Sequence, residues 1–525
     1  MGFPKPNLLN TTEWVSLFVG FILVALIGPP VGAVVGSCVL WEACDRGFAG
    51  GFVESGQELS GFIFARLIPL IERITTPYAL PIIIKMYLPR SPHSHKKKTF
   101  SCSQRRLNKR LVKHEDDAFL VNATIWFCLG LPLLLTTFGY YHLQATSLTA
   151  QLTLCWLYHV IRMGPMFMNF AYVYSLCHKE GHAAAAGHGL WRPPFDRHGP
   201  FRYLFNWWVG LYYGVLPATF AIGHSINHHK YNNGPADVVS TADKPRDEWL
   251  NLIAYVPRFA LYACNISTTW QFIKERKYGV ALNTALGSAY YFAWCYLVGK
   301  YYGGFFAFAY LVYPFLEQTL MLSGINWVWH AFLDPNDVEN EYVQSITILG
   351  GTINVLNEDS HVVHHQYPGF HWSKHPKLLT KHADEYKSSL GSVFYGTHTF
   401  EVLALILMAD YEKLADRFVG YMPDNAESEL FGSTKEFMLN KQKANDAIKK
   451  PTCPLPHAEV VELLKERLRA CWWGPRAAHV PPELLQGTAG TSFARMKEWE
   501  MVDDVDVDAP AAEPAPEKGA KLKTR

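Results

Sequence analysis

Long uncharged runs of apolar residues dominate the pattern of hydrophobic and polar positions along the chain. Residues 14–41, 118–141, 203–223 and 278–299 contain no charged side chain. Each run reaches the ~20 residues that a helix needs to cross the hydrocarbon core of a bilayer. The apolar residues are gathered into these runs rather than spread with globular periodicity, so the pattern indicates a membrane protein.

Two pairs of apolar runs are separated by short turns and predict two helical hairpins. The first pairs 118–141 with 150–177, and the second pairs 278–299 with 303–329. Because short connections join antiparallel neighbours, each hairpin returns to the side of the membrane on which it began. A histidine follows each hairpin, His178 after the first and His330 after the second.

Two further segments are predicted to lie at the membrane interface or to be re-entrant. The run 203–223 is long enough to span, but it contains Pro217 and has histidine clusters at both ends. Clusters that serve one metal site must share a membrane face, so this run should not span. We treat residues 250–272, which Arg258 interrupts, in the same way.

The N-terminal part of the chain supplies the predicted orientation. The run 14–41 is too long for a signal-peptide core, and we interpret it as an additional membrane helix. A cluster of lysines and arginines between Arg90 and Lys113 precedes the second run. The positive-inside rule places that cluster in the cytoplasm, and parity then places the histidines there too, with the N-terminus outside or in the lumen.

Composition narrows the classes of partner and of metal site. The chain has 48 basic and 46 acidic residues, so it has no broad basic surface and nucleic acid is disfavoured as a partner. Its ten cysteines are scattered without CxxC pairs. The sequence therefore indicates neither a cysteine-ligated zinc site nor a disulfide framework.

Histidine clusters carry the candidate chemistry. Three clusters have the sequences HKEGH, HSINHH and HVVHH, and a fourth element is NWVWH. Residues three or four apart share a helix face, so the imidazoles can converge. One zinc ion needs only three or four ligands, whereas nine histidines fit two metals. Imidazole suits iron, copper, nickel and zinc. The candidate ligands are His178, His182, His224, His228, His229, His330, His361, His364 and His365, with Asn326 beside His330.

The order and spacing of these clusters resemble those of the membrane fatty acid desaturases, including acyl-CoA and sphingolipid members. The stretches NHHKYNNGPADVVST (Asn227–Thr241) and NEDSHVVHHQYP (Asn357–Pro368) resemble the regions around the second and third histidine boxes of that family. The resemblance covers residues 118–410. The first box has three intervening residues where many members have four, and the WVW sequence around Val328 is unusual.

The resemblance implies a fold, a cofactor and partners. The nine histidines would hold two iron ions, with Asn326 contributing through a water molecule, and dioxygen would be the co-substrate. A lipid acyl chain would occupy a tunnel, and membrane cytochrome b5 with its reductase, or a plastid ferredoxin, would supply electrons. With the apolar runs, this predicts an all-α polytopic membrane protein with two transmembrane helical hairpins under a cytosolic helical cap, plus an extra N-terminal membrane helix.

The apolar runs stop after Ala409, and an Asp, Ala, Pro and Glu bias beyond Met501 predicts a disordered tail. The chain ends in KLKTR, which resembles the dilysine retrieval signal of the endoplasmic reticulum. We predict that membrane as the location, with the histidines facing the cytosol, and a plastid membrane as the alternative. The predicted divisions are an N-terminal membrane helix and basic loop (1–117), the desaturase-like membrane and cap domain (118–410), a soluble extension (411–500) and the tail (501–525).

Several charged residues lie where they could support the site. Carboxylates can fix the tautomers of metal-bound imidazoles, and the candidates are Glu180, Asp237, Glu358 and Asp359. For each of them a solvated or capping role is the interpretation that we favour. Arg162 and Glu317 lie at similar depth in different hairpins, and buried membrane charges usually pair, so we predict that they do.

Two alternatives to an acyl desaturase stay open. A lipid or carotenoid hydroxylase or ketolase would use the same iron centre, and the histidine boxes do not separate it from a desaturase. A histidine-rich metal transporter belongs to another class of protein. Its histidines should line a path across the membrane rather than gather at one face.

Overall fold

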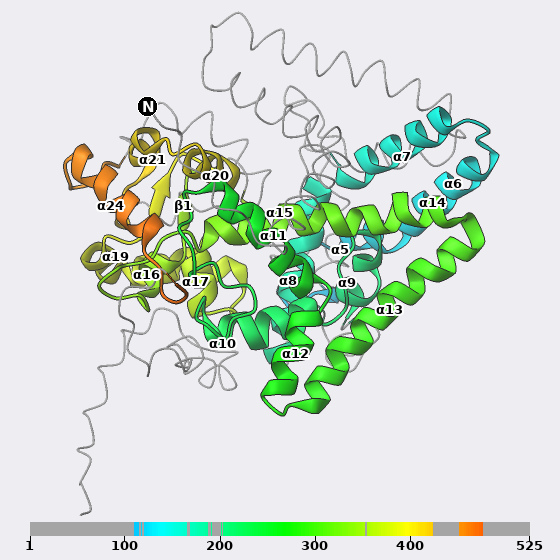
Figure 1. Ribbon diagram of the computed structural model, residues 1–525, viewed down its shortest axis with the longest axis horizontal. Coiled ribbons are helices and arrows are strands. Elements are labelled where there is room, and N and C mark those ends of the chain that lie inside the picture. The colour runs from blue at the N-terminus through cyan, green and yellow to red at the C-terminus, as the bar shows by residue number, and fades with distance from the viewer. Residues whose placement is uncertain are drawn as a thin grey trace, which may run out of the picture.

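The computed structural model describes residues 110–114, 117, 120–164, 168–186, 191, 201, 203–351, 354–423 and 451–475. The predicted N-terminal membrane helix, most of the basic cluster and the predicted tail lie outside the described residues. The described part is mostly helical. Long helices extend to one side of the molecule, and a group of short helices with a two-stranded sheet lies on the other (Figure 1).

The first predicted hairpin forms, but its second limb is divided. Helices α5 (Leu120–Ile125), η2 (Trp126–Gly130) and α6 (Leu131–Gln144) follow one another directly, and a short turn leads to α7 (Leu148–Met163). The Ser147 side chain caps α7 by accepting a hydrogen bond from the Ala150 N–H at 3.2 Å. Helix α7 ends at Gly164, whose φ of +72° few residues other than glycine adopt. Helix α8 (Met168–Ala186) then carries the first histidine box inside it rather than after it.

The second hairpin matches its predicted bounds closely. Helix α13 (Tyr278–Tyr302) turns at Gly303 into α14 (Gly304–Ala307), η6 (Phe308–Val312) and α15 (Tyr313–Trp329). Helix α15 runs back from the far end of the hairpin toward the short helices (Figure 1). His330 is the first residue after α15, as the sequence indicates.

Two helical stretches, Ala123–Gln144 and Gly304–Trp329, are long and apolar enough to cross a membrane. Each is one limb of a predicted hairpin. Large apolar side chains are also exposed along α6, α7 and α13, among them Leu133, Leu152 and Leu286. Such a surface suits lipid better than water. The number of crossings and the orientation stay predictions.

The segment 203–223 is not a continuous helix. It contains the short helices α9 (Leu204–Trp207) and η4 (Val209–Tyr212), and a turn from Gly214 to Ala218 leads into η5 (Thr219–His228), a π-helix. The turn packs closely against α13 and α15. A side chain at Gly214 would meet the Phe315 backbone on α15, and one at Gly287 on α13 would meet the Pro217 carbonyl. This broken backbone supports the prediction that the segment does not span.

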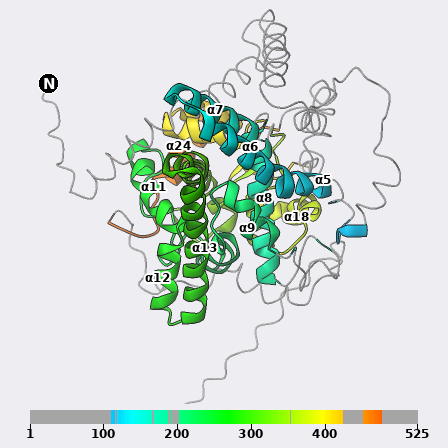
Figure 2. The ribbon, with the colours of Figure 1, turned by 90° about the vertical axis from the view of Figure 1, so that its right-hand side faces the viewer.

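Helices α11 (Trp249–Ala263) and α12 (Ile266–Lys274) form the second predicted interfacial segment. Helix α11 packs on α15, and α12 lies beside α13 (Figure 2). Their outer faces expose Trp249, Leu261, Ile266 and Trp270. An amphipathic pair with exposed tryptophans suits a membrane–water interface, although its depth in a bilayer stays a prediction.

The short helices form a cap around His229, His330 and the third histidine box. Strands β1 (Thr347–Leu349) and β2 (Val393–Tyr395) pair in parallel, with Thr347 opposite Val393. The other elements of the cap are α10 (His229–Tyr231), α16 (Glu341–Gln344), α17 (His361–Gln366), η7 (Trp372–Lys374), α18 (His375–Lys381), α19 (Ala383–Ser389), α20 (Thr399–Leu407), α21 (Tyr411–Arg417) and α24 (His457–Arg469).

Residues 451–475, which the sequence places in a soluble extension, pack into this cap. The buried Arg246 guanidinium donates to the backbone carbonyls of Ala331 and Arg467, each at 2.9 Å. The indole N–H of Trp473 donates to Ser240 Oγ at 2.9 Å. These bonds tie α24 and the residues after it to the chain next to His330.

Candidate metal centre

Four elements bring the nine candidate histidines together. His178 and His182 lie one turn apart on α8, and the third box lies on α17. The π-helix η5 carries His224 and His228, and His229 follows it directly. Its wider turn places residues five apart on one side, so His224 and His229 face the same point. His330 caps the end of α15.

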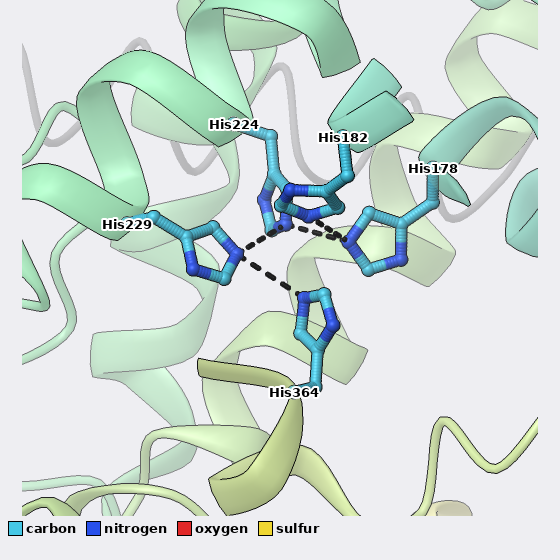
Figure 3. Close-up of side chains that lie close together, drawn as sticks. All are labelled: His178, His182, His224, His229 and His364. Carbon is cyan, nitrogen blue, oxygen red and sulfur yellow. Dashed lines mark hydrogen bonds between the residues drawn. The ribbon is translucent and has the colours of Figure 1, made fainter. Parts of the chain in front are cut away.

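Five of the imidazoles form the first group, which consists of His178, His182, His224, His229 and His364. Their Nε2 atoms converge on one another (Figure 3). The Nε2 of His178 lies 2.6 Å from that of His224 and 3.1 Å from that of His182. The Nε2 of His229 lies 3.0 Å from that of His224 and 3.1 Å from that of His364.

The second group consists of His228, His330, His361 and His365. A ligand atom from each of His228, His330 and His365 lies within 4.8 Å of the others. The Nε2 of His361 joins them, at 3.2 Å from that of His330 and 3.1 Å from that of His365. The two groups adjoin, because the rings of His229 and His365 stack with centroids 4.3 Å apart.

Neighbouring side chains fix the tautomers of three of these imidazoles. Asp237 accepts a hydrogen bond from His228 Nδ1 at 2.7 Å, and the Glu358 carboxylate lies 3.1 Å from His178 Nδ1, where it favours a proton on that nitrogen. Ser225 Oγ donates to the Phe220 carbonyl at 3.0 Å and therefore accepts from His182 Nδ1 at 3.2 Å. A neutral imidazole carries one N–H, so the Nε2 atom of each ring presents a lone pair.

This donor set fits metal ions. The Nε2 lone pairs of His178 and His182 face each other at 3.1 Å without a proton to share. The Nε2 of His228 is buried and has no hydrogen-bond partner in the described part of the chain. A cation in the first group would satisfy the His178 and His182 nitrogens, and a cation in the second group would satisfy the His228 nitrogen. Lone pairs on several buried imidazoles are the ligands that iron and related metals prefer.

Burial keeps the imidazoles ready to bind a metal. It lowers the pKa of His229, His364 and His365 well below the usual value for histidine, and the neighbouring histidines lower the pKa further. These rings are therefore neutral near pH 7, which is the form that coordinates a metal.

Comparison with known families agrees with this geometry. Residues 154–397 match the model of a family described as Fatty acid desaturase. This part of the chain belongs to the membrane fatty acid desaturase family. The match contains all four histidine elements. Neither a search of curated proteins nor one of solved structures finds a match. The family is membrane-bound, and membership together with the histidine groups indicates a desaturase-type oxidoreductase.

The carboxylates that the sequence singled out have different roles in this site. Asp237 and Glu358 are buried against ligand candidates, so the solvated role that we favoured is wrong for both, and Asp237 additionally caps its own turn. Burial opposes ionisation of Glu358, but its interactions with Lys179 and His178 outweigh this effect and lower its pKa to about 2. Glu180 instead accepts hydrogen bonds from the backbone N–H groups of Phe205 and Asn206, at 3.0 and 2.7 Å. Asp359 contacts none of the nine histidines.

Asn326 has a clear place but an untested role. Its side-chain amide donates to the Val239 carbonyl at 3.1 Å and to the Tyr255 hydroxyl at 2.8 Å. Its side chain also lines the cavity described below. A contribution to metal binding through water stays a prediction.

Sequence reasoning missed three residues that support the histidines. Ser225 lies inside the second box and fixes His182, and Lys179 lies inside the first box and pairs with Glu358 at 3.1 Å. The Trp329 ring packs against that of His361, with ring centroids 4.1 Å apart and a tilt of 33° between the ring planes. The unusual WVW sequence was the one signal that pointed to it.

A cavity of about 170 Å³ adjoins the histidine groups. His178, His224 and His361 form part of its wall. Most of the remaining wall is apolar and comes from α8, α11 and α15, the turn before η5, and the start of α20. An apolar space that borders a metal-binding set suits a hydrocarbon chain.

Replacing Asp237 by asparagine is expected to weaken metal binding, tested with iron, by about 10–100-fold, the usual effect of removing a partner of a metal-bound histidine. The carboxylate is held by the backbone N–H groups of Asn233 and Val239, at 3.0 and 2.9 Å, so it is fixed before metal binds. Iron retained by purified protein during titration with a chelator measures the effect. Asp384→Asn, at an exposed position of the cap, is the matched control. Equal retention in both variants would contradict this role.

Proposed function

We propose that this chain is a membrane-bound di-iron desaturase that introduces a double bond into a fatty acyl or sphingoid chain. The observation that carries the proposal is the gathering of nine imidazoles in two adjoining groups beside an apolar cavity. A transporter would need such ligands along a path. Their gathering at one place supports an enzyme.

The reaction balances with an external source of electrons. Two hydrogen atoms leave adjacent methylene carbons, and a carbon–carbon double bond forms. Dioxygen accepts four electrons, of which two come from the C–H bonds and two from a donor protein. Two protons from solvent complete the formation of two water molecules.

When bound, the two irons supply the dioxygen activation that breaking an unactivated C–H bond requires, which no protein side chain provides. The residues of the chain orient the metal ligands and bind the hydrocarbon substrate. Asp237, Glu358 and Ser225 hold the Nδ1 protons of three ligands. The apolar cavity wall excludes water and holds the hydrocarbon next to His178 and His361. This placement selects the carbons that react.

The partners and location belong to the same proposal. The sequence contains no HPGG haem-binding motif of a fused cytochrome b5 domain, so a separate donor is expected. Membrane cytochrome b5 with its reductase fits a location in the endoplasmic reticulum. Ferredoxin fits the alternative, a plastid membrane.

Yeast that expresses the chain should contain a lipid with a new double bond, detected by mass spectrometry of fatty acids and sphingoid bases. The His364→Ala, His365→Ala double variant removes one imidazole from each group and should abolish the product. His457→Ala is the matched control, because this histidine is half exposed at the start of α24 and lies outside both groups. It should leave the product unchanged.

Other products would change the assignment. A new hydroxyl or keto lipid that depends on the same histidines would favour a hydroxylase or ketolase. Purified protein without iron, together with absence of any new lipid, would count against an iron enzyme altogether.

A further inference from the structure

The cavity wall carries several polar side chains, among them Ser175, Thr219, Gln318 and Glu358, and some of its polar residues lie close to His361. Asp359 lines the cavity two residues before His361, so their Cα atoms are at most ~7 Å apart. Thr399 also lines it, and its hydroxyl accepts a hydrogen bond from the Trp329 indole at 3.3 Å. Because the Trp329 ring packs against that of His361, Thr399 lies near the second histidine group too. Asn326 and His398 also line the cavity.

Asp359 lacks the partner that a buried carboxyl normally has. Its side chain is buried, and Oδ2 has no hydrogen-bond partner in the part of the chain that the structure describes. The neighbouring carboxylate, Glu358, is already used by His178 and Lys179. Buried polar groups in folded proteins are almost always satisfied. A carboxyl that lines a cavity without a partner therefore indicates a ligand that provides one.

The charge of the lining restricts the chemistry of that ligand. Among the described residues that line the cavity there is no lysine or arginine. A phosphate group would meet only carboxylates and neutral side chains here, which is unfavourable. A hydroxyl or an amide N–H instead donates to a carboxylate, and a hydroxyl or an amide carbonyl also accepts from Asn326 or Thr399.

We propose that Asp359 binds a hydroxyl or amide N–H in the polar head of the lipid substrate. This inference rests on the proposed function and names its substrate class. Since Asp359 adjoins His361, the carbons that react lie within a few bonds of the polar head, and the apolar tail lies along Phe170, Leu216 and Met321. An N-acylated long-chain amino alcohol has this arrangement of groups. A long acyl thioester that reacts at mid-chain does not.

Two measurements on the full-length protein test the proposal. The first is the position of the new double bond in yeast lipids, determined by fragmentation mass spectrometry after feeding a deuterated N-acylated long-chain amino alcohol or a deuterated fatty acid. The second needs no turnover. It is the retention of the same N-acylated amino alcohol by protein purified in detergent. The variants are Asp359→Leu and Asp359→Asn, with Asp384→Leu at an exposed cap position as the control.

We expect a double bond next to the polar head of the amino alcohol. Asp359→Leu should lower both the yield and lipid retention about tenfold or more, because it removes a buried hydrogen bond. The Asp359→Asn variant should keep part of the yield and part of the lipid retention, since its amide oxygen still accepts a hydrogen bond. Iron content should equal that of the wild type in both variants, because Asp359 does not contact the histidines.

Three results would overturn the proposal while leaving the proposed function intact. They are a double bond only at mid-chain of the fatty acid, equal lipid retention in Asp359→Leu and Asp384→Leu, and a loss of iron that parallels the loss of product. If the wild type makes no new lipid, the proposed function fails first. The retention measurement then still decides whether Asp359 binds the head group.

Discussion

Alanine at His182 or at His330 is expected to abolish the lipid product, with a loss of activity of more than about 100-fold. Loss of a residue that only orients a ligand costs about 10–100-fold, and these residues present nitrogens inside the two groups. His182 belongs to the first group and His330 to the second. Each variant should therefore lose iron from one group first, so that purified protein retains fewer than two ions per chain.

Elemental analysis of the purified variants, together with lipid mass spectrometry, measures both effects. The His182→Ala, His330→Ala double variant should retain no iron. His457→Ala controls for the substitution itself. The stacked rings of His229 and His365 connect the groups, so a single variant that loses all its iron would show that the groups bind cooperatively. A variant that retains full iron would exclude that histidine from the ligands.

The sequence predicts the parts of this fold that depend on local periodicity. The uncharged runs marked the limbs of both hairpins, and the helical spacing of His178 and His182 placed them on one face of α8. The break at Gly164 was missed, because a glycine within an apolar run does not by itself end a helix. The π-helical turn of η5 was also missed, since its widened winding depends on packing against α8.

Contacts between distant residues limited the prediction of the site. Asp237 reaches His228 because the chain reverses at Asn232 and Asn233, both of which have positive φ. Spacing alone does not separate this carboxylate from Asp243, which pairs with Arg258 instead. Likewise, Glu358 and Asp359 are adjacent in sequence and both line the cavity, yet only Glu358 lies against a candidate ligand, His178. Only the direction of each side chain distinguishes them.

The predicted pairing of Arg162 with Glu317 is confirmed, and it joins the two hairpins. Arg162 on α7 donates to the Glu317 carboxylate on α15, and both side chains are buried. Arg162 Nε also donates to His159 Nδ1 at 3.3 Å. The Tyr213 hydroxyl donates to the Arg162 carbonyl at 2.6 Å, which ties in the broken segment between the hairpins. Arg162 therefore links the two hairpins and the broken segment between them.

Arg162→Leu and Glu317→Leu, made singly, are each expected to lower the free energy of unfolding by about 3–5 kcal/mol, because each leaves one buried charge without its partner. The double variant should recover much of this loss, since two leucines leave no charge to desolvate. Thermal unfolding of protein purified in detergent should rank the wild type first, then the double variant, then the single variants. Iron content should not change in correctly folded protein, because neither residue belongs to the histidine groups. Single variants as stable as the wild type would show that the pair contributes nothing to joining the hairpins.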